Sequence, residues 1–183
     1  MNGIGTEINK DKGFELFNEA AGKKVGDTQN LLNENDDKID DIDKVNYWYH
    51  KSAESDNKVA LYKLGECHEM GKGICKNLAK SFEFYKKSAE QGCSEAQYKV
   101  GYYYNNGLGL TVDFNKEKAI DFYKMAAKNG NSNAQKNLAH LYAQNNETNN
   151  AIYWYKKAIN NGCQEVQESL DNLLKATKNQ YQK

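Results

Sequence analysis

Hydrophobic residues recur along this chain with the spacing of an α-helix. In five segments a large pair stands three and four residues after a reference position, and in most of them a small residue follows at position eight. Positions 0, 3, 4 and 8 lie on one face of a helix. The pattern therefore predicts five amphipathic helices whose large residues pack between neighbouring units. The pairs are Leu16/Phe17, Trp48/Tyr49, Phe84/Tyr85, Phe122/Tyr123 and Trp154/Tyr155, and the small residues include Ala89 and Ala127.

A second helical pattern precedes three of these helices, over roughly 58–70, 94–106 and 132–144. A glycine stands in the middle of two copies, at Gly65 and Gly101, and Ala139 takes its place in the third. A glycine inside a helix costs about 1 kcal/mol relative to alanine. Because the small residue recurs, we expect the partner helix to lie too close for a larger side chain. The other inward positions are Ala60, Leu64, Cys67 and His68, then Ala96, Val100, Tyr103 and Tyr104, then Ala134, Leu138, Leu141 and Tyr142.

Glycines also mark the turns between these helices. Two copies carry Gly-x-Gly, with Gly71 and Gly73 in one and Gly107 and Gly109 in the other, which favours positive φ between the helices. The third copy has Gln144-Asn145-Asn146 instead, for which we expect a shorter turn with asparagine in the left-handed region. Each copy then closes with a glycine, at Gly92, Gly130 and Gly162.

The copies that begin at Ala60, Ala96 and Ala134 repeat after 36 and 38 residues. A period of this length is typical of a stacked solenoid. We therefore predict an all-α fold, an α/α superhelix (solenoid) of antiparallel helix pairs, whose first residues lie in the middle of a repeat of a longer array. The predicted divisions are a partial repeat with only its second helix at 1–23, a degenerate repeat at 24–57, repeats at 58–93 and 94–131, a shortened repeat at 132–163, and a capping helix with a tail at 164–183.

Composition narrows the range of partners. The 25 basic residues balance 25 acidic ones, so no strong field favours nucleic acid or an anionic membrane. The sequence has no run of about 18 apolar residues, so we expect no membrane insertion. We identify no secretory leader and expect a cytoplasmic monomer with reduced cysteines. These cysteines are Cys67, Cys75, Cys93 and Cys163.

No catalytic constellation is visible. Cys67 and His68 are adjacent on a helix and point about 100° apart. They also occupy positions that hold packing residues in the other copies, so they do not indicate a zinc site. His50, His68 and His140 lie in different copies without a matched nucleophile. The Gly-Lys-Gly at 71–73 joins two helices and does not follow a strand, as a phosphate loop would. We therefore expect no enzyme, no metal and no cofactor.

The first helices of a helical solenoid line its concave face, where partners bind. Tyr98 and Tyr102 are four residues apart and share one side of their helix. Exposed aromatic residues are enriched at binding hot spots. The alternative is that both rings only fill the groove between repeats. The candidate partner-binding residues are Tyr62, Lys63, Glu66, Tyr98, Lys99, Tyr102 and His140.

The pattern resembles the Sel1-like repeat family, a branch of the tetratricopeptide-type helical repeats, over most of residues 2–174. The copy at 94–131 matches most fully, at Ala96, Gly101, Tyr104, Gly107, Gly109, Lys118, Ala119, Phe122, Tyr123, Ala126, Ala127 and Gly130. The resemblance implies a scaffold or adaptor for a protein or peptide partner. It also implies two alternatives, the repeat region of a larger signalling protein such as a kinase fusion, and a secreted cysteine-containing protein with hydrolase-like activity. Secreted relatives carry one disulfide per repeat, but Ser88 and Ala89 stand where Cys93 would need its partner.

Overall fold

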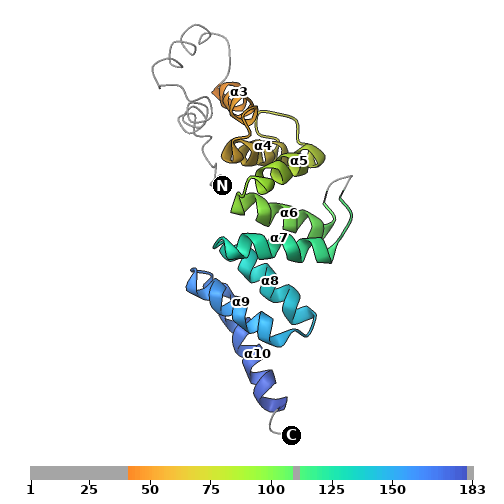
Figure 1. The fold of residues 1–183 in the computed structure, drawn as a ribbon, viewed down its shortest axis with the longest axis vertical. Helices are drawn as coiled ribbons and strands as arrows, with labels where there is room; N and C mark the ends of the chain where they lie inside the picture. Colours follow the sequence, from red (N-terminus) through yellow and green to blue (C-terminus); the bar gives the residue numbers. More distant parts are fainter. Residues whose placement is uncertain (1–40, 109–111, 181–183) are drawn as a thin grey trace, which may run out of the picture. The chain divides into compact units, whose positions relative to one another are not determined.

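The computed structural model describes residues 41–108 and 112–180 (Figure 1). The chain forms two compact units, which divide between Cys93 and Ser94. The described residues contain eight α-helices and no strand, which confirms the predicted all-α fold of helix pairs. The predicted partial repeat at 1–23, the segment 24–40 and Gly109 lie outside the described residues.

The first unit contains α3 (Asp41–Ala53), α4 (Lys58–Met70) and α5 (Leu78–Glu90). Helix α4 packs against both of the others (Figure 1). Its apolar face joins Tyr49 of α3 in a small core of Ala60, Leu64 and Cys67. Two serines of α5 add hydrogen bonds to this contact, because Ser81 Oγ donates to the Gly65 carbonyl (2.8 Å) and Ser88 Oγ to that of Lys58 (2.6 Å).

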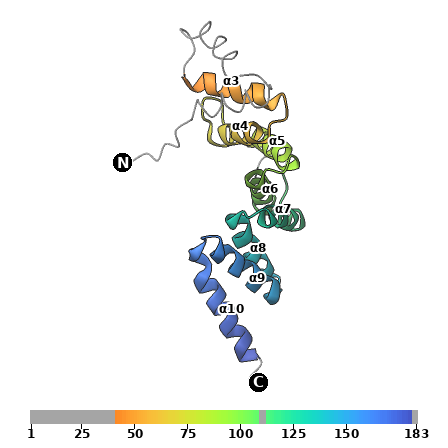
Figure 2. The ribbon, with the colours of Figure 1, turned by 60° about the vertical axis from the view of Figure 1, so that its left-hand side comes forward.

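The second unit contains two helix pairs and a final helix. The first pair is α6 (Ser94–Asn106) with α7 (Lys116–Lys128), and the second is α8 (Ser132–Gln144) with α9 (Thr148–Asn160). A 3-10 turn, η1 (Gln164–Val166), leads into α10 (Gln167–Gln180), which packs on α9 (Figure 2). Val166 and Leu170 are buried there, so they cover the last helix pair.

The first helices have the bounds that the sequence predicts, whereas α5, α7 and α9 begin three residues before Ser81, Ala119 and Ala151, the reference positions of the pattern. Asparagine side chains cap two of these earlier starts. Asn77 Oδ1 accepts from the Lys80 amide (3.0 Å) and Asn115 Oδ1 from the Lys118 amide (2.8 Å). An N-cap oxygen satisfies an amide that has no partner within the helix. Asn57 and Asn131 cap α4 and α8 in the same way.

The mid-helix glycines lie where a partner helix comes close, as predicted. A Cβ atom on Gly65 would stand 2.5 Å from Cδ1 of Tyr85. On Gly101 it would stand 2.8 Å from Cδ1 of Tyr123 and 3.3 Å from the Ala119 carbonyl oxygen. Both tyrosines are fully buried, so their rings have no space into which to move. The glycines therefore set the distance between the two helices of a pair.

The turns also follow the sequence prediction. Gly71 has φ 73°, Gly73 has φ 66° and Gly107 has φ 58°, values that favour glycine. Gly73 is exposed, so its part in the repeat is the left-handed backbone of the turn and not a close helix contact like that of Gly65. In the shortened copy Asn146 adopts φ 60°, so asparagine replaces the glycine in a turn that spans only residues 145–147. The glycines that close the copies have φ of 80° at Gly92, 87° at Gly130 and 91° at Gly162.

Amide pairs join the helices of the second unit. Asn129 Nδ2 donates to Gln97 Oε1 (3.1 Å), and Asn161 Nδ2 donates to Gln135 Oε1 (2.9 Å). Gln97 and Gln135 are both buried. Gln135 Nε2 also donates to the Ala127 carbonyl (3.0 Å), so one side chain links two successive repeats. Since a buried amide without partners would be costly, these bonds specify the register of the helices.

Candidate partner-binding surface

The regular spacing of the second helices places one tyrosine of each at equivalent positions, with its hydroxyl beside a polar residue of a first helix. Tyr85 Oη donates to Glu69 Oε2 (2.7 Å), and Asn137 Nδ2 donates to Tyr123 Oη (3.2 Å). Tyr155 Oη and His140 Nδ1 share a hydrogen bond of 2.7 Å. Burial raises the pKa of all three tyrosines, so their hydroxyls keep their protons near neutral pH.

In the first unit the candidate residues on α4 contact one another. Tyr62 Oη donates to Glu66 Oε1 (3.0 Å), and Lys63 Nζ donates to Glu66 Oε2 (2.6 Å). All three side chains are half-buried. The two oxygens of Glu66 are thus both engaged within the helix, and this group is a closed network of hydrogen bonds.

In the second unit the two candidate tyrosines of α6 differ in their surroundings. Tyr98 is half-buried, and its ring lies 6.0 Å from that of the buried Tyr123. Tyr102 is 37% exposed, and its ring centroid lies 6.3 Å from that of Tyr98. Tyr98 is therefore partly covered beside a buried ring, and Tyr102 is the more exposed of the two.

Helix α8 extends this surface with Lys136, Asn137 and His140. Lys136 Nζ donates to Glu165 Oε1 at 2.6 Å. That hydrogen bond raises the pKa of Lys136, and Tyr98 lies close enough to add to the shift. Burial lowers the pKa of His140, and the charge of Lys136 lowers it further, so the imidazole is neutral at pH 7. We call Tyr98, Tyr102, Lys136, Asn137 and His140 the first-helix face of the second unit.

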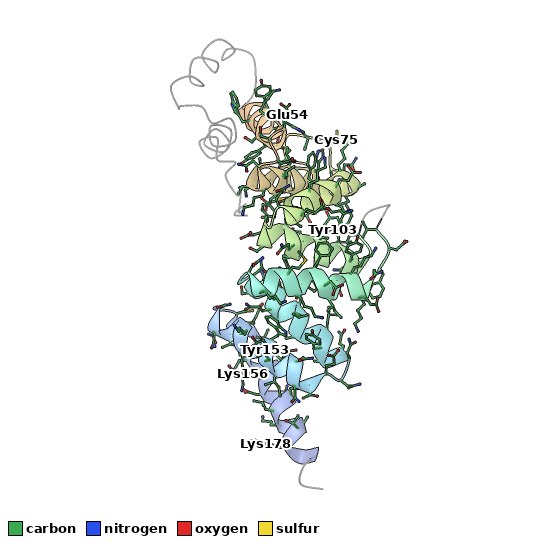
Figure 3. The ribbon with its side chains drawn as sticks, viewed as in Figure 1. Glu54, Cys75, Tyr103, Tyr153, Lys156 and Lys178 are labelled. Atoms are coloured by element: carbon green, nitrogen blue, oxygen red, sulfur yellow. The ribbon has the colours of Figure 1, made fainter. Side chains whose placement is uncertain are left out.

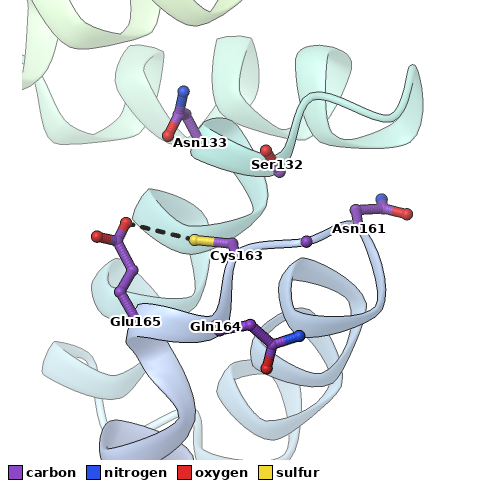
Figure 4. A pocket seen from close by; sticks show the side chains of 7 residues that line it. Ser132, Asn133, Asn161, Cys163, Gln164 and Glu165 are labelled. Atoms are coloured by element: carbon purple, nitrogen blue, oxygen red, sulfur yellow. Dashed lines mark hydrogen bonds between the residues drawn. The ribbon is translucent and has the colours of Figure 1, made fainter.

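A hollow of about 370 Å³ opens beside Glu165 (Figure 4), the residue to which Lys136 donates. Its walls come from the start of α8 and from the segment 161–165, and Cys163 Sγ donates to Glu165 Oε1 there (3.4 Å). Burial raises the pKa of Cys163, and the bond to Glu165 raises it further, so this thiol is not the thiolate that nucleophilic chemistry needs. The hollow is lined by Ser132, Asn133, Asn161, Gly162, Cys163, Gln164 and Glu165.

The remaining cysteines and histidines do not form a common site in the described residues. All four cysteines are free; Cys67 and Cys93 are buried and Cys75 is exposed. His68 is buried and stacks on Phe84, with ring centroids 5.5 Å apart, and the exposed His50 meets the edge of the same ring. Across the described ranges, no three His, Cys, Asp or Glu side chains gather as a metal site requires. Over the same ranges, no helix has the length and hydropathy needed to cross a membrane.

Sequence reasoning did not predict the hydrogen bonds that these polar side chains make. The asparagine caps had a usable signal, because an asparagine stands directly before four of the helices. The bonds of Glu69 and Asn137 had none, since the hydroxyl that each contacts lies 14 or 16 residues away along the chain.

A family model described as Sel1 repeat matches residues 1–24, 41–57, 58–93, 94–131 and 132–163. Among solved structures, c5321, a protective antigen present in uropathogenic Escherichia coli strains, is 28% identical with a TM-score of 0.64. The match covers 88% of this chain and 32% of c5321, so the chain spans about a third of that protein. Comparison with curated proteins gave no significant match.

Two smaller proteins share the fold at lower identity. A Sel1 repeat protein from Oxalobacter formigenes is 24% identical with a TM-score of 0.60, and the match covers 68% of this chain and 95% of that one. Cysteine rich protein B of Helicobacter pylori is 22% identical with a TM-score of 0.52, covering 72% of this chain and 97% of its own. At this level of identity, both comparisons show a shared fold only.

Proposed function

Because the chain belongs to the Sel1 repeat family, we propose that it is a non-catalytic scaffold that binds a protein partner on the first-helix face of the second unit. Sel1-like repeats generally serve as protein-interaction scaffolds. The observation that carries the proposal is the exposure of Tyr102. This large aromatic side chain lies on a first helix and outside the core of the repeat.

The surroundings of Tyr102 support this role. Its ring lies beside Tyr98, whose own ring rests on the buried Tyr123. An aromatic residue that is already held in place loses little conformational freedom when a partner covers it. Asn137, His140 and Lys136 supply hydrogen-bonding groups on α8, and Lys136 lies near Tyr98. A hydrophobic centre with a polar rim is the usual composition of a protein interface.

We also propose a cytoplasmic setting, in which the four thiols remain reduced. Their free state in this structure supports the proposal. Alkylation of protein in freshly broken cells, followed by mass spectrometry, should find all four cysteines as reduced thiols. A disulfide between any two of them would favour the secreted alternative.

The binding proposal is tested by affinity capture with three baits: the unchanged chain, Tyr102→Ala and Tyr47→Ala. Tyr47 is the matched control, because it is an exposed tyrosine (53%) on α3, outside the first-helix face. We expect a protein that the unchanged chain and Tyr47→Ala retain and that Tyr102→Ala loses. If the Tyr102→Ala bait retains this protein equally well, the partner binds elsewhere. Circular dichroism of each bait confirms that both substitutions leave the helices folded.

A further inference from the structure

The outer side of α9 departs from the pattern that α5 and α7 follow. Helix α3 also has an exposed tyrosine at the equivalent position, Tyr47, but its Lys51 pairs with Glu54. At the position five residues after the start of the helix, α5 has Glu83 and α7 has Asp121, and both carboxylates are exposed. Helix α9 has Tyr153 there, 51% exposed. In α5 and α7 this carboxylate lies within one turn of exposed or half-buried lysines, a spacing at which opposite charges attract. In α9 the lysines remain and the carboxylate is missing.

Three residues of α9 therefore form a basic and aromatic surface, which we call the α9 patch: Tyr153, Lys156 and Lys157. Figure 3 shows Tyr153 and Lys156 on this helix. Helix α9 contains no Asp or Glu, and neither lysine has an ion-pair partner among the described residues. The nearest carboxylate along the chain, Glu147, precedes the helix and accepts from Asn150 Nδ2 (2.8 Å). The positive charge of the patch is thus uncompensated within α9.

The ring of Tyr153 is held in a defined position. It meets the edge of Trp154 with ring centroids 5.0 Å apart, and Trp154 packs against the core of the second unit. Lys157 Nζ lies 5.8 Å from the Tyr153 ring centroid, within the range of a cation–π contact. An exposed aromatic ring anchored on the core, with a cation beside it, is the arrangement found at interface hot spots.

We infer that the α9 patch is a second interaction surface, distinct from the first-helix face, and that it binds an acidic segment of a protein partner. Carboxylates of such a segment complement Lys156 and Lys157, and its apolar side chains cover Tyr153. Nucleic acids and anionic membranes are held by larger basic clusters, on the order of four to ten Lys or Arg. Two lysines on a chain of zero net charge fit a short peptide better than either polyanion.

The probe is a phage-displayed library of random dodecapeptides, selected on the immobilised full chain. The decisive variant is Tyr153→Asp, which places on α9 the residue type that α7 carries at the same position and so preserves a sequence compatible with the helix. We expect enriched peptides rich in Asp and Glu. Synthetic copies should bind Tyr153→Asp about tenfold more weakly or worse, bind Tyr153→Phe like the unchanged chain, and bind Tyr102→Ala equally well.

Three outcomes would overturn the inference. The first is the absence of any enriched peptide. The second is a set of acidic peptides that bind both Tyr153→Asp and a Lys156→Glu/Lys157→Glu variant with the affinity they show for the unchanged chain. The third is Tyr153-dependent binding to phosphatidylserine vesicles or to a 30-nucleotide RNA in place of acidic peptides, measured with the same proteins. Matching thermal melts of the variants and the unchanged chain ensure that a loss of binding reports on the patch.

Discussion

The repeats at 94–131 and 132–163 lie next to each other in the same unit and build the same helix pair by different means. The first has Gly101 at the helix contact, a long turn that contains Gly107, and Asn115 as the cap of its second helix. The second has Ala139 at the contact, a three-residue turn with Asn146, and Glu147 at the cap position, where no side-chain bond forms. Both keep the buried glutamine that accepts from an asparagine at the end of the second helix.

This difference separates what a helix pair requires from what is only common in it. Small residues at the contact and the amide pair are present in both copies, so close packing and a fixed register are the requirements. The turn length and the N-cap vary, because they act at the ends of helices that tertiary packing already stabilises. The partner of the buried tyrosine also varies, since Tyr123 bonds to an amide and Tyr155 to an imidazole. Each repeat thereby presents different chemistry on the same backbone.

The largest expected effect is on the helix contact. Gly101→Leu forces a side chain against the buried Tyr123 ring and the Ala119 carbonyl, so it should lower the free energy of unfolding by about 1–3 kcal/mol. Urea denaturation followed by circular dichroism measures the change. Ala139→Gly is the control, because it removes a methyl group without a clash and should cost only about 0.5–1 kcal/mol. If Gly101→Leu is as stable as the unchanged chain, the two helices do not approach as closely as the structure indicates.

A smaller effect concerns the caps of the two second helices. Asn115→Ala removes the oxygen that accepts from the Lys118 amide and should cost about 1 kcal/mol. Glu147→Asn should change stability in the opposite direction, by up to about 1 kcal/mol, because it offers α9 the cap that it lacks. Thermal unfolding of both variants tests the comparison. Loss of stability in Glu147→Asn would mean that the short turn holds this residue in a conformation unsuited to capping.

The smallest expected effect is on the pH dependence of stability, in which the histidine partner of Tyr155 should differ from the asparagine partner of Tyr123. Burial and the charge of Lys136 lower the pKa of His140, with Glu165 opposing, so the unfolded chain binds this proton more readily than the folded one. Stability should therefore fall as the pH drops below about 6.5, the ordinary value for histidine. His140→Asn, which offers Tyr155 an amide as Asn137 does for Tyr123, should lose less stability between pH 7.5 and 5.5. Equal losses for both proteins, measured by urea midpoints, would contradict this assignment.

Much of the fold follows from the sequence because the repeat compares the chain with itself. Gly65 and Gly101 stand at equivalent positions in spite of their poor helix propensity, and this alone indicates a close contact. The asparagine caps were missed for the opposite reason. Asparagine is frequent throughout the chain, so its position before a helix does not stand out in the composition.

The binding surface was harder to predict. Tyr98 and Tyr102 share a side of one helix, and helical spacing treats them alike. Only the neighbouring α7, which supplies Tyr123, decides that the first ring is covered and the second is exposed. Glu66 likewise has the spacing of an outward residue, but Tyr62 and Lys63 occupy both of its oxygens.

The sequence by itself therefore determined the helix pairs, their order, their turns and their close contacts. Each of these depends on neighbours within one helix or on positions that recur in every copy, and periodicity reveals both. Only the tertiary structure decided which polar groups are engaged and which side chains remain open to a partner. These choices depend on residues from different helices that meet in space, such as Lys136 with Glu165 or Tyr155 with His140, and no repeating pattern encodes such pairs.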